Sequence, residues 1–321
     1  NLGCAFAEGE QGLNIARCAA LIAGLPQSVG GSTVNRWCGS SMQAIQMAAG
    51  AIAMGAGDAC VAGGVESMSR VPIMGFNPMP NPAWSDAQRI AFLNMGLTAE
   101  NLADRYGISR EEQDAYSLES QKKALAARAD SRLATEIAPI GGVTADSCPR
   151  ETDAEKLAGL KTAFKAGGSG TAGNSSPLTD GASATLVCSE DFVKRHNLAP
   201  LARISGYAIS GCAPEIMGIG PVEASRKALK RAGISAGDLD VIEMNEAFAV
   251  QVLSCCRDLD IDPARLNRDG GAIALGHPLG ATGARLVGKA SLLLKRDRGR
   301  HALATQCIGG GQGIAMVLEA A

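Results

Sequence analysis

The sequence predicts an α/β fold made of two similar units, with a separate segment inserted between them. Three observations support this prediction. A strand, a turn, a helix and a second strand surround Cys38, and a similar pattern returns near the end of the chain. Between these two regions, the composition changes from residue 72 to about residue 176. Alternating strands and helices are typical of layered α/β folds.

The first unit is predicted from short patterned stretches before residue 72. Apolar residues at helical spacing follow Cys38, and Ser40 or Ser41 can cap the helix that they predict. The next apolar run ends in two glycines and reads as a buried strand. In order, we expect a helix at 11–24, a strand at 32–34, a helix over 42–52 and a strand at 59–65.

The inserted segment begins where the periodicity is lost. Residues 72–86 hold four prolines and two methionines, as is common at a domain boundary. Residues 98–130 are charged and helical in pattern, with Thr98 and Ser109 as N-cap candidates. An irregular, glycine-rich stretch follows at 141–170. We therefore interpret 72–176 as an inserted loop domain.

The second unit repeats the pattern of the first. The stretches 35–66 and 267–312 each contain a polar or glycine-rich turn, an Ala-rich helix and a strand running into Gly-Gly. This predicts an N-terminal half formed by 1–71 with 177–199, and a C-terminal half formed by 200–321. We expect strands at 184–189, 241–244, 302–307 and 313–318, and helices at 222–232 and up to about Arg296.

Composition limits the function classes. The net charge of −2 gives no basic surface for nucleic acid or an anionic membrane, and 46% hydrophobic residues can fill large cores. The ten cysteines include no C-x-x-C pair and no cysteines and histidines at zinc spacing. We therefore expect reduced thiols, no metal site and a cytoplasmic location.

The uncharged stretch 37–57 has the length of a membrane span. Its serines, glutamines, alanines and glycines favour a buried helix of an α/β core instead.

Cys38 is the first candidate for chemistry. It lies at or just before a predicted helix N-terminus, where unpaired N–H groups and the helix dipole favour a thiolate and lower the thiol pKa. The same cysteine could equally be a small buried hydrophobe. The stretch alone leaves a nucleophile and a packing residue as equal alternatives.

Two further polar positions lie in turns. His277 is flanked by glycines and a proline in a turn that opens a helix, where it is either a packed ring or a catalytic base. Asn245 follows an apolar strand, the usual place for an α/β site, but it could also serve as a helix N-cap.

Cys307 and Gly309 belong to a glycine-rich loop whose backbone N–H groups could bind an oxyanion. A phosphate-binding loop is the rival interpretation, but this loop lacks the Walker lysine.

Together these residues resemble one family, the thiolases. Four motifs occur in the family's order: Asn-Arg-x-Cys38-x-Ser-Ser-x-Gln-Ala, Asn245-Glu-Ala-Phe, Gly-Gly-Ala-Ile-Ala-x-Gly-His277-Pro-x-Gly and Cys307-x-Gly309-x-Gly-Gln-Gly. The residues in and around these motifs are most similar to those of bacterial 3-ketoacyl-CoA thiolases of fatty-acid oxidation. The resemblance covers nearly the whole chain and implies a duplicated, layered αβαβα core.

The resemblance implies a role for each motif. Cys38 would be the nucleophile that becomes acylated, and His277 would activate it and help to bind the thioester oxygen. Cys307 would move the proton at the α-carbon of acetyl-CoA. Asn245 would hold a water in one oxyanion hole, and the N–H groups of Cys38 and Gly309 would form another. The reaction would be thiolytic cleavage of a 3-ketoacyl-CoA in fatty-acid β-oxidation.

The resemblance also implies coenzyme A as a co-substrate, with no permanently bound cofactor. It assigns seven CoA-contacting residues: Met95, Phe164, Ala172, Ser176, Met217, Ala247 and Phe248. It further implies a homodimer or homotetramer, with acyl-CoA and CoA as small-molecule partners and a multifunctional β-oxidation subunit as a candidate protein partner.

The chain departs from the family pattern in places. It lacks the family's opening strand and helix, the run at 146–151 is short, and Arg150 is one position away from an arginine that contacts the CoA nucleotide. Asn94 stands where some relatives carry histidine.

Three other functions remain as alternatives. A biosynthetic acetoacetyl-CoA thiolase would use the same residues. A β-ketoacyl synthase would carry histidine or asparagine in place of Cys307, and a non-catalytic acyl-CoA-binding relative would lack at least one of Cys38, His277 and Cys307.

Overall fold

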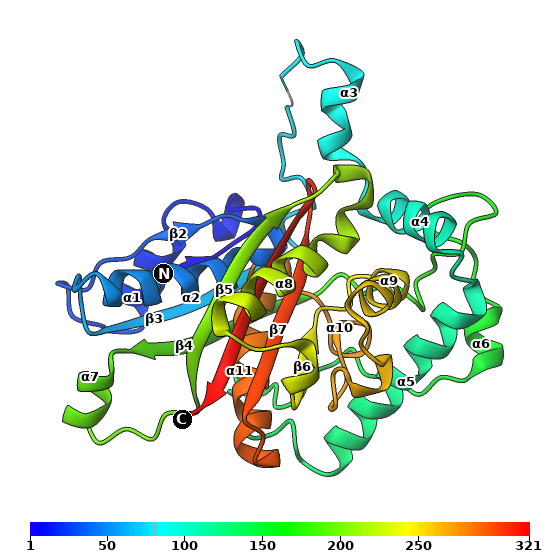
Figure 1. Cartoon of the computed structure of the whole chain (residues 1–321). Coiled ribbons are helices and arrows are strands. Elements are labelled where there is room, and N and C mark those ends of the chain that lie inside the picture. Colours follow the sequence, from blue (N-terminus) through cyan, green and yellow to red (C-terminus); the bar gives the residue numbers. More distant parts are fainter. Residues whose placement is uncertain (80) are drawn as a thin grey trace.

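Two four-stranded sheets form the centre of the molecule in the computed structural model, which describes residues 1–79 and 81–321, with the backbone alone at 86 and 87 (Figure 1). Position 80 of the predicted insertion lies outside the described residues. The first sheet has the order β2-β1-β3-β4 and the second β5-β8-β7-β6. The strands are β1 (Leu2–Gly3), β2 (Thr33–Val34), β3 (Ala59–Ser67), β4 (Asp180–Cys188), β5 (Ala202–Gly211), β6 (Val241–Met244), β7 (His301–Ile308) and β8 (Gln312–Ala320).

The helices lie between and outside these sheets. They are α1 (Ile15–Ile22), α2 (Ser40–Ala53), α3 (Asp86–Arg89), α4 (Met95–Tyr106), α5 (Arg110–Ala129), α6 (Ala154–Ala158), α7 (Glu190–Arg195), α8 (Gly220–Ala232), α9 (Ala249–Leu259), α10 (Ala272–Leu275) and α11 (Thr282–Asp297).

Three strands of each sheet share one topology, β1-β3-β4 in the first and β6-β7-β8 in the second, which agrees with the predicted duplication. The fourth strands, β2 and β5, lie at opposite edges. In the first sheet, β3 is parallel to β1 and antiparallel to β4. In the second, β7 is parallel to β6 and antiparallel to β8. A long helix precedes the central strand in each half: α2 precedes β3, and α11 precedes β7.

The helices α2 and α11 pack against each other in the layer between the two sheets. One buried cluster joins Met42 and Ile45 of α2 to Val287 and Leu294 of α11 and to apolar side chains of β7 and β8. A second cluster lies on the other face of the second sheet, where α8 and α9 cover it. Within the stretch 37–57, residues 39–48 are mostly buried in this layer, whereas residues 53–57 are exposed. No helix in the described ranges combines the length and the apolar character needed to cross a bilayer.

Some predicted helix starts differ from the observed ones. The N-cap of α2 is Gly39, and the Ser40 hydroxyl donates to the Trp37 carbonyl oxygen at 2.5 Å, so neither predicted serine caps the helix. The helix α4 begins at Met95 with Asn94 as its cap, which places Thr98 inside the helix. Ser109 does cap α5, with the reciprocal bond from its backbone N–H to Glu112.

The two halves touch along a row of glycines. A Cβ on Gly64 of β3 would overlap the carbonyl oxygen of Gly280, and one on Gly283 would overlap the backbone of Met42. Because glycine has no side chain at these positions, α11 and the turn before it can lie directly on β3 and α2. This close approach brings the His277 turn next to the Cys38 turn.

We predict that Gly64→Ala lowers the free energy of unfolding by about 1–3 kcal/mol or more, because backbone has to move to admit the methyl group. The matched control is Gly50→Ala in α2, where a Cβ meets nothing within 4 Å. That change should stabilise by about 0.5–1 kcal/mol, since alanine is the better helix former. Urea unfolding of both variants measures the difference, and equal stabilities would contradict the close contact.

Candidate active site

The predicted catalytic residues lie on three turns and on the last part of β7, and they meet where β6 and β7 end. Cys38 belongs to a short 3-10 helix at 37–39 that leads directly into α2. Asn245 follows β6, and Cys307 lies near the end of β7. His277 lies in the turn between α10 and α11. The sheet ends and the glycine contacts therefore gather residues that are up to 269 positions apart.

The turn of Cys38 is held by β7 and by the loop after it. The side-chain amide of Gln306 donates to the carbonyl oxygen of Cys38. The backbone N–H of Gly309 faces the Cys38 sulfur and favours its thiolate form. Both contacts fix the sulfur relative to the Cys307 loop.

The Cys38 thiol keeps its proton in this state. Cys38 is partly exposed as a residue, but the protein packed around its sulfur raises the pKa to about 12. The Gly309 N–H opposes this rise, and Glu66 adds to it. The prediction of a lowered pKa is wrong in direction, because burial outweighs the N–H groups at the helix start. Attack by Cys38 therefore requires a base that takes the proton.

His277 has the tautomer of such a base. Its Nδ1 lies 2.6 Å from the Thr282 hydroxyl oxygen, and that hydroxyl donates its only hydrogen to the Pro278 carbonyl at 3.1 Å. Both contacts of the Thr282 hydroxyl are satisfied together when Nδ1 carries the hydrogen and donates to Thr282. Nε2 is then the unprotonated nitrogen, 3.3 Å from the Asn245 amide, which donates to it.

Burial keeps His277 neutral. The side chain is 4% exposed, and burial lowers its pKa to about 3, with the nearby Arg285 guanidinium as the second cause. In the described part of the chain, no hydrogen bond joins Cys38 to His277 directly. The ring is thus a neutral acceptor held by Asn245 and Thr282, close to the turn that carries the thiol.

Cys307 is a second protonated thiol. It is 1% exposed, and its pKa is raised well above the ordinary value, first by burial and second by the proximity of Cys38. Two neutral thiols and one neutral imidazole therefore share the site. Such a set can accept a proton at one atom and deliver one at another without burying a net charge.

Five of the seven predicted CoA residues lie together with Cys307. One apolar cluster at the edge of the site contains Met217, Ala247 and Phe248, and Met95 and Phe164 pack against it. Phe164 and Phe248 meet edge to face, with ring centroids 5.7 Å apart. The cluster joins α4 of the insertion to the loop before α9.

The other two predicted residues lie beside this cluster. The Ser176 N–H donates to the Ala247 carbonyl at 3.0 Å, so the end of the insertion is tied to the loop after Asn245. Ala172 is exposed, and its carbonyl accepts from Arg150 at 3.4 Å. The structure thus brings Arg150 to the predicted CoA face despite its shift in sequence.

Three residues of the site escaped the motif analysis. Thr282 sets the His277 tautomer, Gln306 holds the Cys38 carbonyl, and Glu66 binds the His277 turn through the Gly280 N–H at 2.8 Å. Thr282 and Gln306 lie next to recognised motifs and Glu66 does not, and none of the three has a spacing signal of its own. Within the described residues, no group of three His, Cys, Asp or Glu side chains could hold a metal ion.

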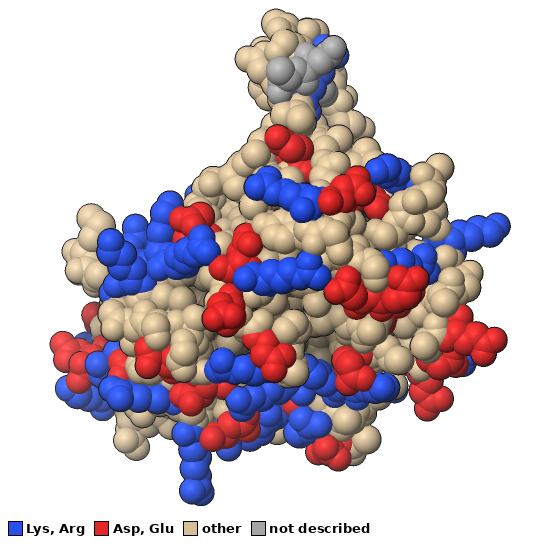
Figure 2. Space-filling model, turned by 45° about the vertical axis from the view of Figure 1, so that its right-hand side comes forward, with Lys and Arg blue, Asp and Glu red and all other residues tan. Residues whose placement is uncertain are grey.

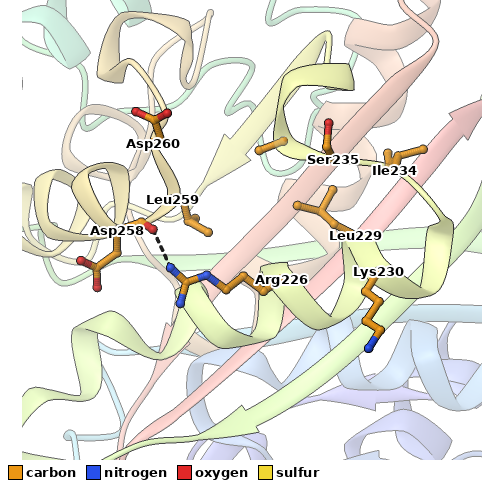
Figure 3. Close-up of a pocket in the computed structure, with 9 residues that line it drawn as sticks. Arg226, Leu229, Lys230, Ile234, Ser235, Asp258, Leu259 and Asp260 are labelled. Carbon is orange, nitrogen blue, oxygen red and sulfur yellow. Dashed lines mark hydrogen bonds between the residues drawn. The ribbon is translucent and has the colours of Figure 1, made fainter.

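A hollow lies between α8 and α9, away from these residues (Figure 3). Its wall includes Arg226, Lys230 and Asp258, and the Arg226 guanidinium donates to the Asp258 carbonyl at 2.7 Å. It lies at the far end of α9, about three helical turns from Phe248. None of the predicted site residues lines it.

Comparison with known proteins places this site in a family. The chain matches the model of the thiolase N-terminal domain over residues 1–191 and that of the thiolase C-terminal domain over 198–320. It is 48% identical to the 3-oxoadipyl-CoA/3-oxo-5,6-dehydrosuberyl-CoA thiolase of Escherichia coli K12, and 43% identical to a 3-ketoacyl-CoA thiolase of Bacillus subtilis. Each match covers 99% of this chain and 86% of the relative.

A solved structure agrees with these matches. Human mitochondrial 3-ketoacyl-CoA thiolase in complex with CoA is 41% identical, with a TM-score of 0.91 over 100% of this chain and 85% of that one. Two family models, close relatives and a shared fold define the class, and the chain belongs to the thiolase family. It is therefore an acyltransferase, as the motifs predicted.

We predict that His277 makes the protein less stable in acid. The unfolded histidine binds a proton below about pH 6.5, whereas the folded one does so only below about 3. Between these values the unfolded state holds more protons, so stability falls as pH falls, by about 1.4 kcal/mol per unit. His277→Gln should show a shallower decline of unfolding free energy between pH 7 and pH 4.

The control for this comparison is His196→Gln, because His196 is exposed. It should keep the slope of the parent protein. Parallel slopes for the parent and His277→Gln would mean that His277 is not held neutral in the folded state.

Proposed function

We propose that this thiolase cleaves 3-ketoacyl-CoA with coenzyme A, giving acetyl-CoA and a shortened acyl-CoA, as a step of fatty-acid β-oxidation. The observation that carries the proposal is the meeting of a buried neutral imidazole with two protonated thiols, Cys38 and Cys307. Thiolysis of a C–C bond requires such a set, namely a nucleophile with its base and a separate proton donor for the leaving carbon.

In the first half-reaction, the Cys38 sulfur attacks the C3 ketone and its proton moves to Nε2 of His277. The C2–C3 bond then breaks, and its electron pair forms the enolate of acetyl-CoA. The Cys307 thiol protonates the α-carbon, acetyl-CoA leaves, and the shortened acyl group remains on Cys38. We assign the backbone N–H groups of Cys38 and Gly309 to the ketone oxygen at C3, and His277 with the water on Asn245 to the thioester oxygen of the enolate.

In the second half-reaction, the thiol of coenzyme A attacks the acyl group on Cys38. The Cys307 thiolate takes the CoA proton, and the proton on His277 returns to the departing Cys38 sulfur. Each residue thereby regains its starting state. The tautomer set by Thr282 suits both steps, because Nε2 is free to accept a proton and Nδ1 is already held.

Coenzyme A is expected to lie against the insertion. The apolar cluster of Met95, Phe164, Met217 and Phe248 suits a pantetheine arm, and Ala172, Ser176 and Arg150 lie beside it. We therefore propose residues 72–176 as the CoA-binding segment. A cytoplasmic location and docking to a multifunctional β-oxidation subunit remain proposals from the family resemblance.

Cys307→Ala is predicted to separate the two half-reactions. The variant should still gain acyl mass on Cys38 from a simple acyl-CoA, because a CoA thiolate can leave without the Cys307 proton, whereas the carbon released by C–C cleavage needs a proton donor. It should cleave 3-ketoacyl-CoA on the order of 10²–10⁴-fold more slowly, the usual contribution of a positioned proton donor. Cys38→Ala should lose both activities. Intact-protein mass and the thiolysis rate measure the two effects.

The control is Cys256→Ala, a similar truncation of a buried cysteine packed between α9 and the second sheet. It should retain both activities. Near-parent cleavage by Cys307→Ala would remove the role given to Cys307, and a parent protein that never gains acyl mass would refute the covalent mechanism. A synthase-like mechanism would not show the split.

We also propose that the chain assembles as a dimer or tetramer through the first sheet. Val61 of β3 and Leu186 of β4 are directly opposite in the strand register, and are 50% and 56% exposed. Neighbouring Cys60 and Ala62 face the core, so this pair lies on the other face. Exposed apolar side chains gathered on one face are typical of an interaction surface.

Light scattering at micromolar concentration is predicted to show a dimer or larger species for the parent protein. Replacing both Val61 and Leu186 with lysine should shift the protein to monomer, because charges are costly to bury at an interface. Ile140→Lys, at a residue 80% exposed in the insertion, is the control and should leave the mass unchanged. A monomeric parent would exclude this assembly.

A further inference from the structure

A pocket next to Cys38 is formed between the body of the molecule and the segment that carries α3. Its volume is about 320 Å³, at the lower end of the range for ligand pockets. Phe6 and Trp37 form the wall on the body, and Met74, Met79, Trp84 and Phe92 form the wall on the segment. In Figure 1 the segment stands out from the body.

We propose that this pocket receives the acyl chain of the substrate and selects uncharged alkyl chains over chains that end in a carboxylate. The inference rests on the proposed thiolase reaction and adds the substrate class and the residues that choose it. The occupant is the part of the 3-ketoacyl group beyond C3, which Cys38 retains after cleavage.

The position of Trp37 connects the pocket to the nucleophile. Trp37 directly precedes Cys38, and its ring packs on the glycine loop that donates to the Cys38 sulfur. A Cβ on Gly310 would be 2.6 Å from the Trp37 ring, and one on Gly309 would be 3.5 Å from it. A single indole therefore contacts the catalytic loop and also lines the pocket, and we take its surface as the route by which a chain on Cys38 enters.

Backbone conformations at both walls support a binding role. Trp37 has a φ of +43° and Met74 a φ of +81°, in the left-handed region that bulky side chains rarely adopt. Such residues are held at a cost of about 1–3 kcal/mol each and are concentrated at binding sites. Here the unusual backbone places one large apolar side chain on each side of the pocket.

The wall on the segment is apolar and partly open to water. Trp84 and Phe92 stack with ring centroids 5.1 Å apart, which makes a rigid surface. Met79 is 79% exposed and Met74 40% exposed. Figure 2 shows charges of both signs over the body and a largely uncharged surface on the segment. An alkyl chain that covers these side chains gains free energy from the apolar area removed from water.

The charge of the lining gives the selectivity. Among the described lining residues none is charged, and those beyond the apolar six are two asparagines and a proline. Burying an ionised carboxylate without a cation is far more costly than burying a methyl group. The name of the Escherichia coli relative includes 3-oxoadipyl-CoA, whose acyl chain ends in a carboxylate. We expect this chain to discriminate against that substrate.

The test compares thiolysis of acetoacetyl-CoA, 3-oxodecanoyl-CoA and 3-oxoadipyl-CoA by the parent protein, Trp84→Ala and Met74→Lys. The parent kcat/KM should favour 3-oxodecanoyl-CoA over 3-oxoadipyl-CoA at least about 10-fold, and Met74→Lys should reduce that ratio at least about 10-fold by supplying a cation. Trp84→Ala should lose at least about 10-fold more on 3-oxodecanoyl-CoA than on acetoacetyl-CoA, which is too short to reach the pocket.

Met54→Lys is the matched control, since Met54 is 86% exposed at the end of α2, and it should retain the parent ratios. Equal kcat/KM for 3-oxodecanoyl-CoA and 3-oxoadipyl-CoA in the parent would overturn the inference without any variant. If Trp84→Ala lowered kcat/KM equally on every substrate, the inference would also be overturned. That result is expected where a second copy of the chain, and not the acyl chain, covers the segment. Failure to cleave even acetoacetyl-CoA, with no acyl mass on Cys38, would refute the proposed function and this inference with it.

Discussion

The buried carboxylate of Glu66 is the contact on which the geometry of the site depends. It is 1% exposed, and accepts from the N–H groups of Ala5 and Phe6 in one half and of Gly280 in the other. Because each acceptor site faces a donor, the charge is stabilised without a cation. Losing it would leave three buried N–H groups unpaired where the halves touch. The turn of His277 would then lose its hydrogen bond to the first half.

Much of the fold could be predicted because its long elements have strong patterns. The strand β6, the helix α8 with its Gly233 cap and the hairpin of β7 and β8 agree closely with the predictions. The strand β1 has only two residues, too few for periodicity to register, whereas the equally short β2 lies within the predicted strand at 32–34. Asn94 is the N-cap of α4 because its side chain accepts from the Gly96 N–H. The sequence alone does not decide between Asn94 and Thr98 as the cap.

The candidate site was predictable in its members but not in its electrostatics. The motifs around Cys38, Asn245, His277 and Cys307 identified the residues that the turns bring together. The pKa of Cys38 depends on how many atoms of other segments surround the sulfur. The residues next to Cys38 in the sequence do not contain that information. Thr282 and Gln306 matter through one hydrogen bond each, and a single hydrogen bond leaves no pattern in a sequence.

The pairing of β3 with β4 has a consequence for how the molecule folds. Ser67 and Asp180 face each other although the whole insertion separates them, whereas Ile308 and Gln312 close a tight hairpin. The entropy lost on closing a loop grows with its length, and pairing across long loops slows folding. The hairpin that carries Cys307 therefore has the smaller entropic barrier, and the first sheet the larger one. Catalytic competence depends on the slower of these closures, since Cys38 is positioned by contacts from both halves.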